Sequence, residues 1–190
     1  MQGNNELKTK YDKEIVPALK KDFGIKNVLQ LPKLVNVSIN VGVGKFSKEE
    51  NFLKSVENAL ASITGQKPVR REAKKSISGF KVREGQVVGI SVSLRGDRMY
   101  SFVNKFLNIV LPRMKDFRGI KVKSMDKNGN ITIGVKEINV FPEVESFDLN
   151  QLFGLEVTLV ANKFVSKEVN AKMLELIGVP FIKETKKLSK

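Results

Sequence analysis

Four segments of the chain alternate strictly between apolar and polar residues, and this period-two pattern constrains the fold more than any other feature. Residues 35–43 place valine or isoleucine at every second position, and residues 88–95, 130–136 and 155–162 repeat the pattern. Successive side chains of a strand point to opposite faces of a sheet, so each segment predicts a strand with one buried and one wet face. Strands of this kind favour antiparallel or mixed pairing.

Between these strands lie four stretches with apolar residues at helical spacing, and each predicts a helix. They span residues 7–23, 47–65, 97–112 and 167–177. Their apolar faces need a partner, which the apolar face of the sheet supplies. The sequence therefore predicts an α+β fold, in which helices pack on one face of a largely antiparallel β-sheet and leave the other, polar face open.

Local signals predict where these helices begin, bend and end. Pro17 lacks a backbone N–H, so we expect a kink or two helical pieces in the first helix. Ser47 and Glu50 have the spacing of a capping box, and Asp97 could cap the third helix. Pro112 predicts the end of that third helix. The other helices are followed by glycine stop signals at Gly24, Gly65 and Gly178.

A chain of 190 residues has the length of one domain, and we expect a single domain over residues 1–190. Two connections, residues 66–87 and 111–129, are predicted to be long and irregular. Loops of that length in a compact domain are usually functional or disordered. A lysine-rich tail, residues 182–190, ends the chain.

The chain carries 34 Lys and Arg against 20 Asp and Glu, and this excess is concentrated in the two loops and the tail. Residues 67–83 have a net charge of +6, residues 95–123 also +6, and residues 181–190 +3, whereas residues 135–170 have −3. A solvated basic surface is one interpretation, but arginines beside glycines in irregular segments favour phosphate contacts. The predicted partner is therefore a nucleic acid, with an anionic membrane surface as the alternative.

The chain has no histidine and no cysteine, and this removes much of enzyme chemistry. Thiolate nucleophiles, cysteine zinc sites and imidazole general bases are excluded. We therefore expect no enzyme, no metal, no cofactor and no small-molecule substrate. No stretch approaches the roughly 20 apolar residues of a membrane span, and the N-terminus lacks the apolar segment of a signal peptide. We expect a cytoplasmic protein that does not bind membranes.

The predicted polar face of the sheet consists mostly of small, neutral, hydrogen-bonding groups. On its first two strands these positions hold Asn36, Ser38, Asn40, Gly42, Gly89, Ser91, Ser93 and Arg95. Glycines allow a close backbone approach, and the face lacks the aromatic residues with which RRM domains stack bases. Such a face suits the 2′-hydroxyls and phosphates of an RNA backbone. From the pattern alone, an ordinary solvated face is equally compatible.

Two further features leave alternatives open at this stage. Phe80 lies in a basic loop, where it is either an exposed anchor at the loop tip or a staple tucked under the loop. Glu143 and Glu145 have no partner that the sequence identifies, so a solvated acidic loop is the expectation for both.

Eight separated strings resemble one protein family, and they occur in that family's order. They are IVPALKKDFGIKNVLQLPKL (15–34), NVGVG (40–44), TGQKPVRREAKKSISGFKVREG (64–85), SLRGDRMYSF (93–102), LPRMKDFRGI (111–120), NGNITIGVKE (128–137), FPEV (141–144) and IGVPF (177–181). Together they cover nearly the whole chain. In these strings the sequence resembles the bacterial-type family of the fifth large-subunit ribosomal protein, which binds 5S rRNA.

The resemblance implies a structural protein in the central protuberance of the large ribosomal subunit, in the cytoplasm, with helices on one side of an antiparallel sheet. The partners it implies are 5S rRNA, large-subunit rRNA, P-site tRNA and a protein of the small-subunit head. The family's 5S rRNA contacts fall on Asn40, Gln66 and Ser93 of this sequence. On the same face and its edge, the expected contact set is Asn36, Ser38, Asn40, Gly42, Gln66, Ser91, Ser93 and Arg95.

Residues 73–85 resemble the family's loop that approaches P-site tRNA. The residues expected to act there are Lys74, Lys75, Ser76, Gly79, Phe80, Lys81 and Arg83. Arg113, Lys115 and Arg118 lie in a region that resembles the surface facing large-subunit rRNA and the intersubunit bridge.

The sequence departs from the family's common pattern at a few positions. Ser93 stands in place of the usual Thr and keeps the hydroxyl, while Val41 and Ile133 replace Met and Phe and stay apolar. The tail is longer than the family needs, so its role is open. The alternative is a non-ribosomal basic RNA- or DNA-binding protein, although the chain has neither helix-turn-helix spacing nor a zinc signature.

Overall fold

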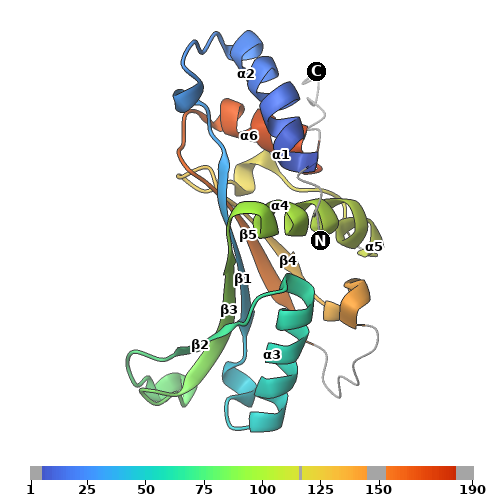
Figure 1. The fold of residues 1–190 in the computed structure, drawn as a ribbon. Coiled ribbons are helices and arrows are strands. Elements are labelled where there is room, and N and C mark those ends of the chain that lie inside the picture. Colours follow the sequence, from blue (N-terminus) through green and yellow to red (C-terminus); the bar gives the residue numbers. More distant parts are fainter. Residues whose placement is uncertain (1–5, 116, 145–152, 183–190) are drawn as a thin grey trace, which may run out of the picture.

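The computed structural model describes residues 6–115, 117–144 and 153–182, and its centre is one five-stranded antiparallel sheet (Figure 1). The strands are β1 (Leu34–Gly42), β2 (Val69–Glu72), β3 (Val87–Leu94), β4 (Ile131–Val135) and β5 (Leu155–Ala161). Their order is β2-β3-β1-β5-β4, and every neighbouring pair is antiparallel. This confirms the predicted α+β fold class.

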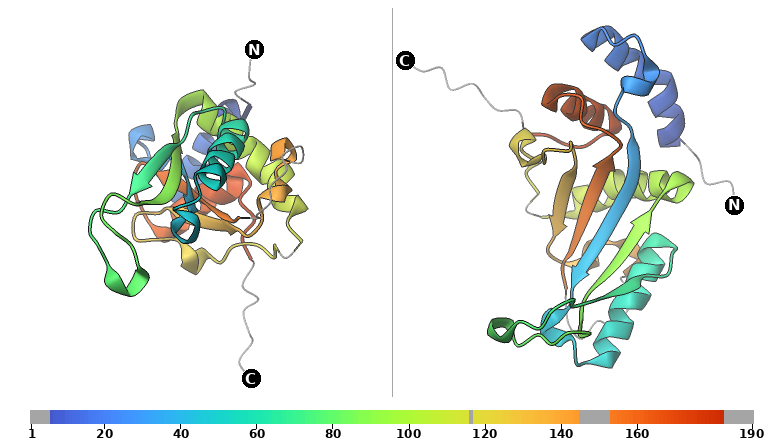
Figure 2. Two further views of the ribbon diagram at one scale, coloured as in Figure 1. Left: turned by 90° about the horizontal axis from the view of Figure 1, so that it is seen from below. Right: turned by 90° about the vertical axis from the view of Figure 1, so that its left-hand side faces the viewer.

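The helices lie on one face of the sheet and at one of its ends. They are α1 (Glu6–Lys10), α2 (Val16–Phe23), α3 (Glu50–Thr64), α4 (Gly96–Lys105), α5 (Leu111–Arg113) and α6 (Lys167–Ile177). In Figure 2 (right) the strands lie in front of α3 and α4, and no helix covers the face turned toward the viewer. None of the helices in the described ranges combines the length and the apolarity needed to cross a bilayer.

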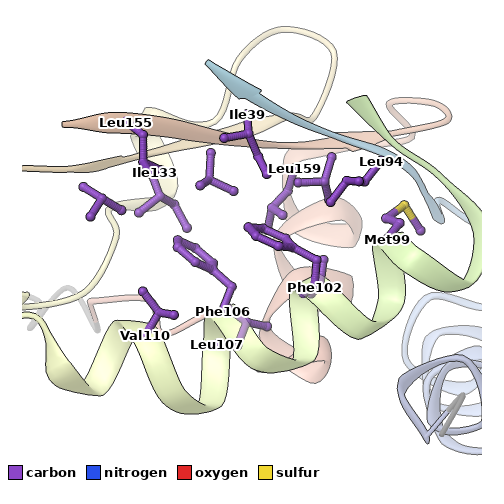
Figure 3. Packing of buried hydrophobic residues seen from close by; sticks show 14 of the residues in the cluster. Ile39, Leu94, Met99, Phe102, Phe106, Leu107, Val110, Ile133, Leu155 and Leu159 are labelled. Carbon is purple, nitrogen blue, oxygen red and sulfur yellow. The ribbon is translucent and has the colours of Figure 1, made fainter. Parts of the chain in front are cut away.

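The core forms where the apolar face of the sheet meets α4 and the π-helical turn Phe106–Val110 that continues it (Figure 3). Phe102 and Phe106 point from this helix toward Ile39 of β1 and Leu159 of β5. Their rings stack with centroids 5.8 Å apart. Burying one such side chain contributes about 1.5–3 kcal/mol, so this layer fixes which face of each strand turns inward.

The N-terminal helix contains the predicted break at Pro17. A π-helical turn, Tyr11–Ile15, joins α1 to α2, and Pro17 occupies the first turn of α2, where its missing N–H costs least. Gly24 then ends α2 with φ of +65°, as expected of a helix stop.

Four local predictions are wrong. The predicted loop at residues 66–87 contains a short edge strand, β2. A bulge in the β1–β5 pairing buries Leu34 and leaves Val35 exposed, against the alternation. The capping box does not form, because the Ser47 hydroxyl instead accepts a hydrogen bond from the Gln86 amide. Asp97 lies in the first turn of α4, after the N-cap residue Arg95.

Arg70 fastens the edge strand β2 to α3. It points to the helical face of the sheet, where its Nε donates to Glu57 Oε1 at 2.5 Å and its Nη2 donates to Glu50 Oε1 at 2.7 Å. Hydrogen bonding to Arg70 holds the pKa of Glu50 below its ordinary value. Two carboxylates thus keep this arginine turned away from the open face.

Tyr11 fastens the N-terminal helix to the start of β1. Its buried hydroxyl donates to the carbonyl oxygen of Pro32 at 2.9 Å. Burial, with smaller contributions from Tyr100 and Asp12, raises the pKa of Tyr11 to about 12. The neutral phenol is therefore the form that the folded protein stabilises.

We expect Tyr11→Phe to lower the free energy of unfolding by about 1 kcal/mol, because it removes a buried hydrogen bond. Urea unfolding at neutral pH measures the change. The control is Tyr100→Phe, since no described residue hydrogen-bonds the Tyr100 hydroxyl. A raised tyrosine pKa gives stability that is lost as pH rises from 10 through about 12. The gap between wild type and Tyr11→Phe should shrink over that interval, and a constant gap would contradict the assignment.

We expect Arg70→Gln to speed hydrogen exchange several-fold in residues 67–73 while leaving α4 unchanged, because it removes both links from β2 to α3. Lys75→Gln, which removes a loop charge, is the matched control. The lowered pKa of Glu50 gives stability above the ordinary value of 4.5 that is lost as pH falls through the lowered value. Wild-type β2 should loosen in acid as well. Equal exchange in the two variants would show that the Arg70 contacts do not hold β2.

Candidate nucleic-acid interface

Strand β1 lies at the centre of the sheet (Figure 2, right), and the burial pattern of β1 places its predicted polar side chains on the open face. Asn40 and Gly42 are exposed, and Asn36 and Ser38 are half-buried. The strand register places β3 on one side of them and β5 on the other. The residues that the alternation assigned to one face are thus brought together on it.

One row of hydroxyl groups crosses four strands of this face. Ser38 of β1 lies opposite Ser93 of β3 on one side and Thr158 of β5 on the other. Thr158 in turn lies opposite Thr132 of β4, and the two hydroxyls are 2.9 Å apart. At the β3 end, Gln66 Nε2 donates to the Ser93 carbonyl oxygen at 3.3 Å, so the predicted contacts Gln66 and Ser93 adjoin. Thr132 and Thr158 thus lie in the same row as the predicted contacts Ser38 and Ser93, although the predicted set does not include them.

A parallel row holds Ser91, Asn40, Glu156 and Gly134, from β3 across to β4. Ser91 is buried, against expectation, because Arg71 of β2 lies over it and donates from Nε to the Ser91 hydroxyl at 2.7 Å. Arg71 is therefore a basic residue of the open face that the sequence did not single out. A search for a β-strand inside residues 66–87 would have found it.

The two ends of the predicted contact set differ in exposure. The Asn36 side-chain oxygen is buried, and no described residue donates a hydrogen bond to it. Arg95 is exposed immediately before α4. The exposed guanidinium of Arg95 is a group that can bind an RNA phosphate, whereas the buried Asn36 oxygen is shielded from an RNA on the surface.

The predicted tRNA-proximal loop projects beyond the sheet at the end far from α2 and α6 (Figures 1 and 2). A single 3-10 turn, Ser78–Phe80, forms its tip, and Lys81 follows with φ of +54°. Phe80 is 79% exposed at the loop tip, so the alternative of a staple tucked under the loop is wrong and the exposed position remains. Exposed positions throughout the loop are held by Lys74, Lys75, Ser76, Gly79, Phe80, Lys81 and Arg83.

The base of this loop is fixed by short polar contacts. Gln86 receives a hydrogen bond from the Arg83 backbone N–H on its side-chain oxygen, and its amide donates to Ser47. The Ser76 hydroxyl accepts from the Glu84 N–H at 2.9 Å, so Ser76 acts inside the loop. A hollow of about 850 Å³ lies beside these contacts, and its lining includes Lys48, Lys81 and Arg83.

The predicted ribosomal RNA and bridge surface follows α5. Arg113 is the last residue of α5, and Arg113, Lys115 and Arg118 are all exposed. Beyond them, Ile120 pairs with Phe181, and the Ile120 N–H donates to the Pro180 carbonyl oxygen at 2.8 Å. The second long connection is thus tied to the segment that follows α6.

Some charges that the sequence assigned to the surface are used inside the molecule. Arg70 belongs to the ion pairs with α3. Glu143, expected to be a solvated acid, pairs with Lys105 at 2.5 Å, and Lys105 also donates to the Ile63 carbonyl oxygen. Glu145 and tail residues 183–190 lie outside the described residues. Across the described ranges, no three His, Cys, Asp or Glu side chains gather closely enough to hold a metal ion.

Two family models together match most of the chain, from residue 27 to residue 181. The model for ribosomal protein L5 matches residues 27–83, and the model for the C-terminus of the same ribosomal family matches residues 87–181.

Curated relatives agree with both models. The large ribosomal subunit protein uL5 of Thermotoga maritima is 46% identical over 175 residues, which cover 92% of this chain and 95% of the relative. The uL5 protein of Caldanaerobacter subterraneus subsp. tengcongensis is 45% identical over 179 residues, or 94% of this chain and 99% of the relative. These are structural ribosomal proteins, which confirms the expectation of a non-enzyme. The chain therefore belongs to the uL5 family of large ribosomal subunit proteins.

Proposed function

We propose that this protein binds 5S rRNA through its open sheet face and attaches it to large-subunit rRNA in the central protuberance. Its place is then the large subunit of cytoplasmic ribosomes, as family membership indicates. The observation that carries the proposal is the hydroxyl row of Ser93, Ser38, Thr158 and Thr132, which crosses an uncovered face and has the Gln66 amide at its β3 end. Such groups match the 2′-hydroxyls and phosphates of a folded RNA.

Affinity and specificity are divided between separate parts of the molecule in this proposal. The row itself carries no charge, whereas Arg71 and Arg95 lie at the β3 side of the face. Basic side chains supply salt-dependent attraction to phosphates. The uncharged row supplies short-range hydrogen bonds that form only with an RNA of matching shape.

The loop at residues 73–85 is the proposed contact to P-site tRNA. The region of Arg113, Lys115 and Arg118 is the proposed contact to large-subunit rRNA and the small-subunit head. Phe80 offers an exposed ring for stacking, flanked by Lys81. The loop projects beyond one end of the sheet, whereas the hydroxyl row crosses the sheet itself, so tRNA and 5S rRNA would contact different parts of the protein. Family membership argues against a non-ribosomal nucleic-acid-binding protein.

We expect Asn40→Ala and Ser93→Ala each to weaken 5S rRNA binding by about five- to tenfold, the effect of one lost hydrogen bond. Filter binding over a salt series measures it, and wild type should show a steep salt dependence. Lys186→Ala in the tail is the comparison and should have the smaller effect. Equal losses in all three variants would show that the sheet face does not recognise 5S rRNA. Weak, salt-insensitive binding by the wild type would contradict the proposed function.

We expect Phe80→Ala to leave 5S rRNA binding unchanged and to weaken P-site tRNA binding several-fold on reconstituted ribosomes. The ring is exposed, so its loss should not disturb folding, while a stacked base would lose its support. Phe164→Ala changes a half-exposed ring outside the loop and serves as the control. If both variants bind P-site tRNA like wild type, Phe80 does not contact it.

A further inference from the structure

Glu156 is an acidic side chain in the middle of the proposed RNA-binding face. It projects from β5 and is exposed, with Asn40 of β1 opposite on one side and Gly134 of β4 on the other. No described residue forms an ion pair or a hydrogen bond with its carboxylate. Glu50, Glu57 and Glu143, by contrast, are each engaged by arginine or lysine.

A free carboxylate on this face repels phosphates, so it cannot add to the general affinity for RNA. It is also an acceptor only, and it is satisfied by a group that offers two adjacent N–H donors. In RNA, the Watson–Crick edge of an unpaired guanine presents such a pair, N1–H and N2–H, beside the acceptor O6. Bases in single-stranded loops expose this edge to proteins.

The neighbours of Glu156 complete a site for that edge. Asn40 lies one strand away, about 5 Å, and its amide can donate to O6. Gly134 has no side chain, and the space where its Cβ would stand is open, which leaves room for a base beside the carboxylate. On the far side of Asn40, Arg71 supplies a cation over β3 that can hold a phosphate.

We propose that Glu156 reads an unpaired guanine of the bound RNA, with its carboxylate accepting from N1–H and N2–H while Asn40 donates to O6. This inference rests on the proposed binding of 5S rRNA by the sheet face. It adds recognition of a base to that face, through a residue that the expected contact set does not contain.

Glu156→Gln tests the inference, because it keeps the side chain's shape and replaces one acceptor by a donor that clashes with the guanine N–H groups. We expect 5S rRNA binding to weaken by about five- to a hundredfold, as for a lost bidentate base contact. Glu168→Gln is the matched control, since it removes one exposed acid on α6. Its binding should stay equal to that of wild type or become slightly tighter.

Kethoxal modification interference supplies the second readout. Kethoxal blocks N1 and N2 of unpaired guanines, so wild-type protein should exclude 5S rRNA modified at one particular guanine. Glu156→Gln should bind that modified RNA no worse than unmodified RNA. Equal or tighter binding by Glu156→Gln, or unchanged interference, overturns the inference and would fit a carboxylate that meets a basic protein partner instead. Failure of wild type to bind 5S rRNA would instead overturn the proposed function.

Discussion

The inward face of β1 is the constraint on which the rest of the structure depends. Val37, Ile39 and Val41 are fully buried, and β1 pairs with both β3 and β5. A slip of one residue would expose all three and bury Ser38 and Asn40, at a cost of several kcal/mol. Because the register is fixed in this way, the hydrophobic core determines which polar groups stand side by side on the opposite face. The polar groups proposed to bind RNA are thus aligned by packing in the hydrophobic core, on the other side of the sheet.

The strands with clean alternation and α6 were predictable from sequence, because their burial depends only on local spacing. Strand β2 was not, since Val69–Glu72 is short, places arginines on both faces and buries none of its residues. Its existence depends on pairing with β3 and on acids of α3 that lie 13 and 20 residues away in the chain. The failure of the capping box at Ser47 was not predictable from sequence for the same reason, because the Ser47 hydroxyl is bound by Gln86, which is distant in the chain.

The candidate interface was predictable as a list of residues but not as an arrangement. Alternation placed Asn40 and Ser93 on one face, yet only the register puts Glu156 beside Asn40 and Thr158 beside Ser38. Likewise, the count of basic residues in the first loop treated Arg70 and Arg71 alike. The pleat sends Arg70 to the acids of α3 and Arg71 to the Ser91 hydroxyl. Two arginines that are adjacent in the sequence therefore have different roles, since Arg70 holds β2 to α3 and Arg71 lies on the open face.

The open face carries opposite charges at separate places, whereas a uniformly basic surface carries charge of one sign. Arg71 lies over β3 and Glu156 on β5, so a cation and an anion stand on opposite sides of Asn40. A phosphate is attracted to the first and repelled by the second, whereas the donor edge of a base is attracted to the second. In the proposed function, an RNA strand laid across the sheet would therefore lie with its backbone toward β2 and its base edges toward β4. The two opposite charges would orient 5S rRNA in this way, whereas the basic loops, whose charge is mostly of one sign, would attract it without orienting it.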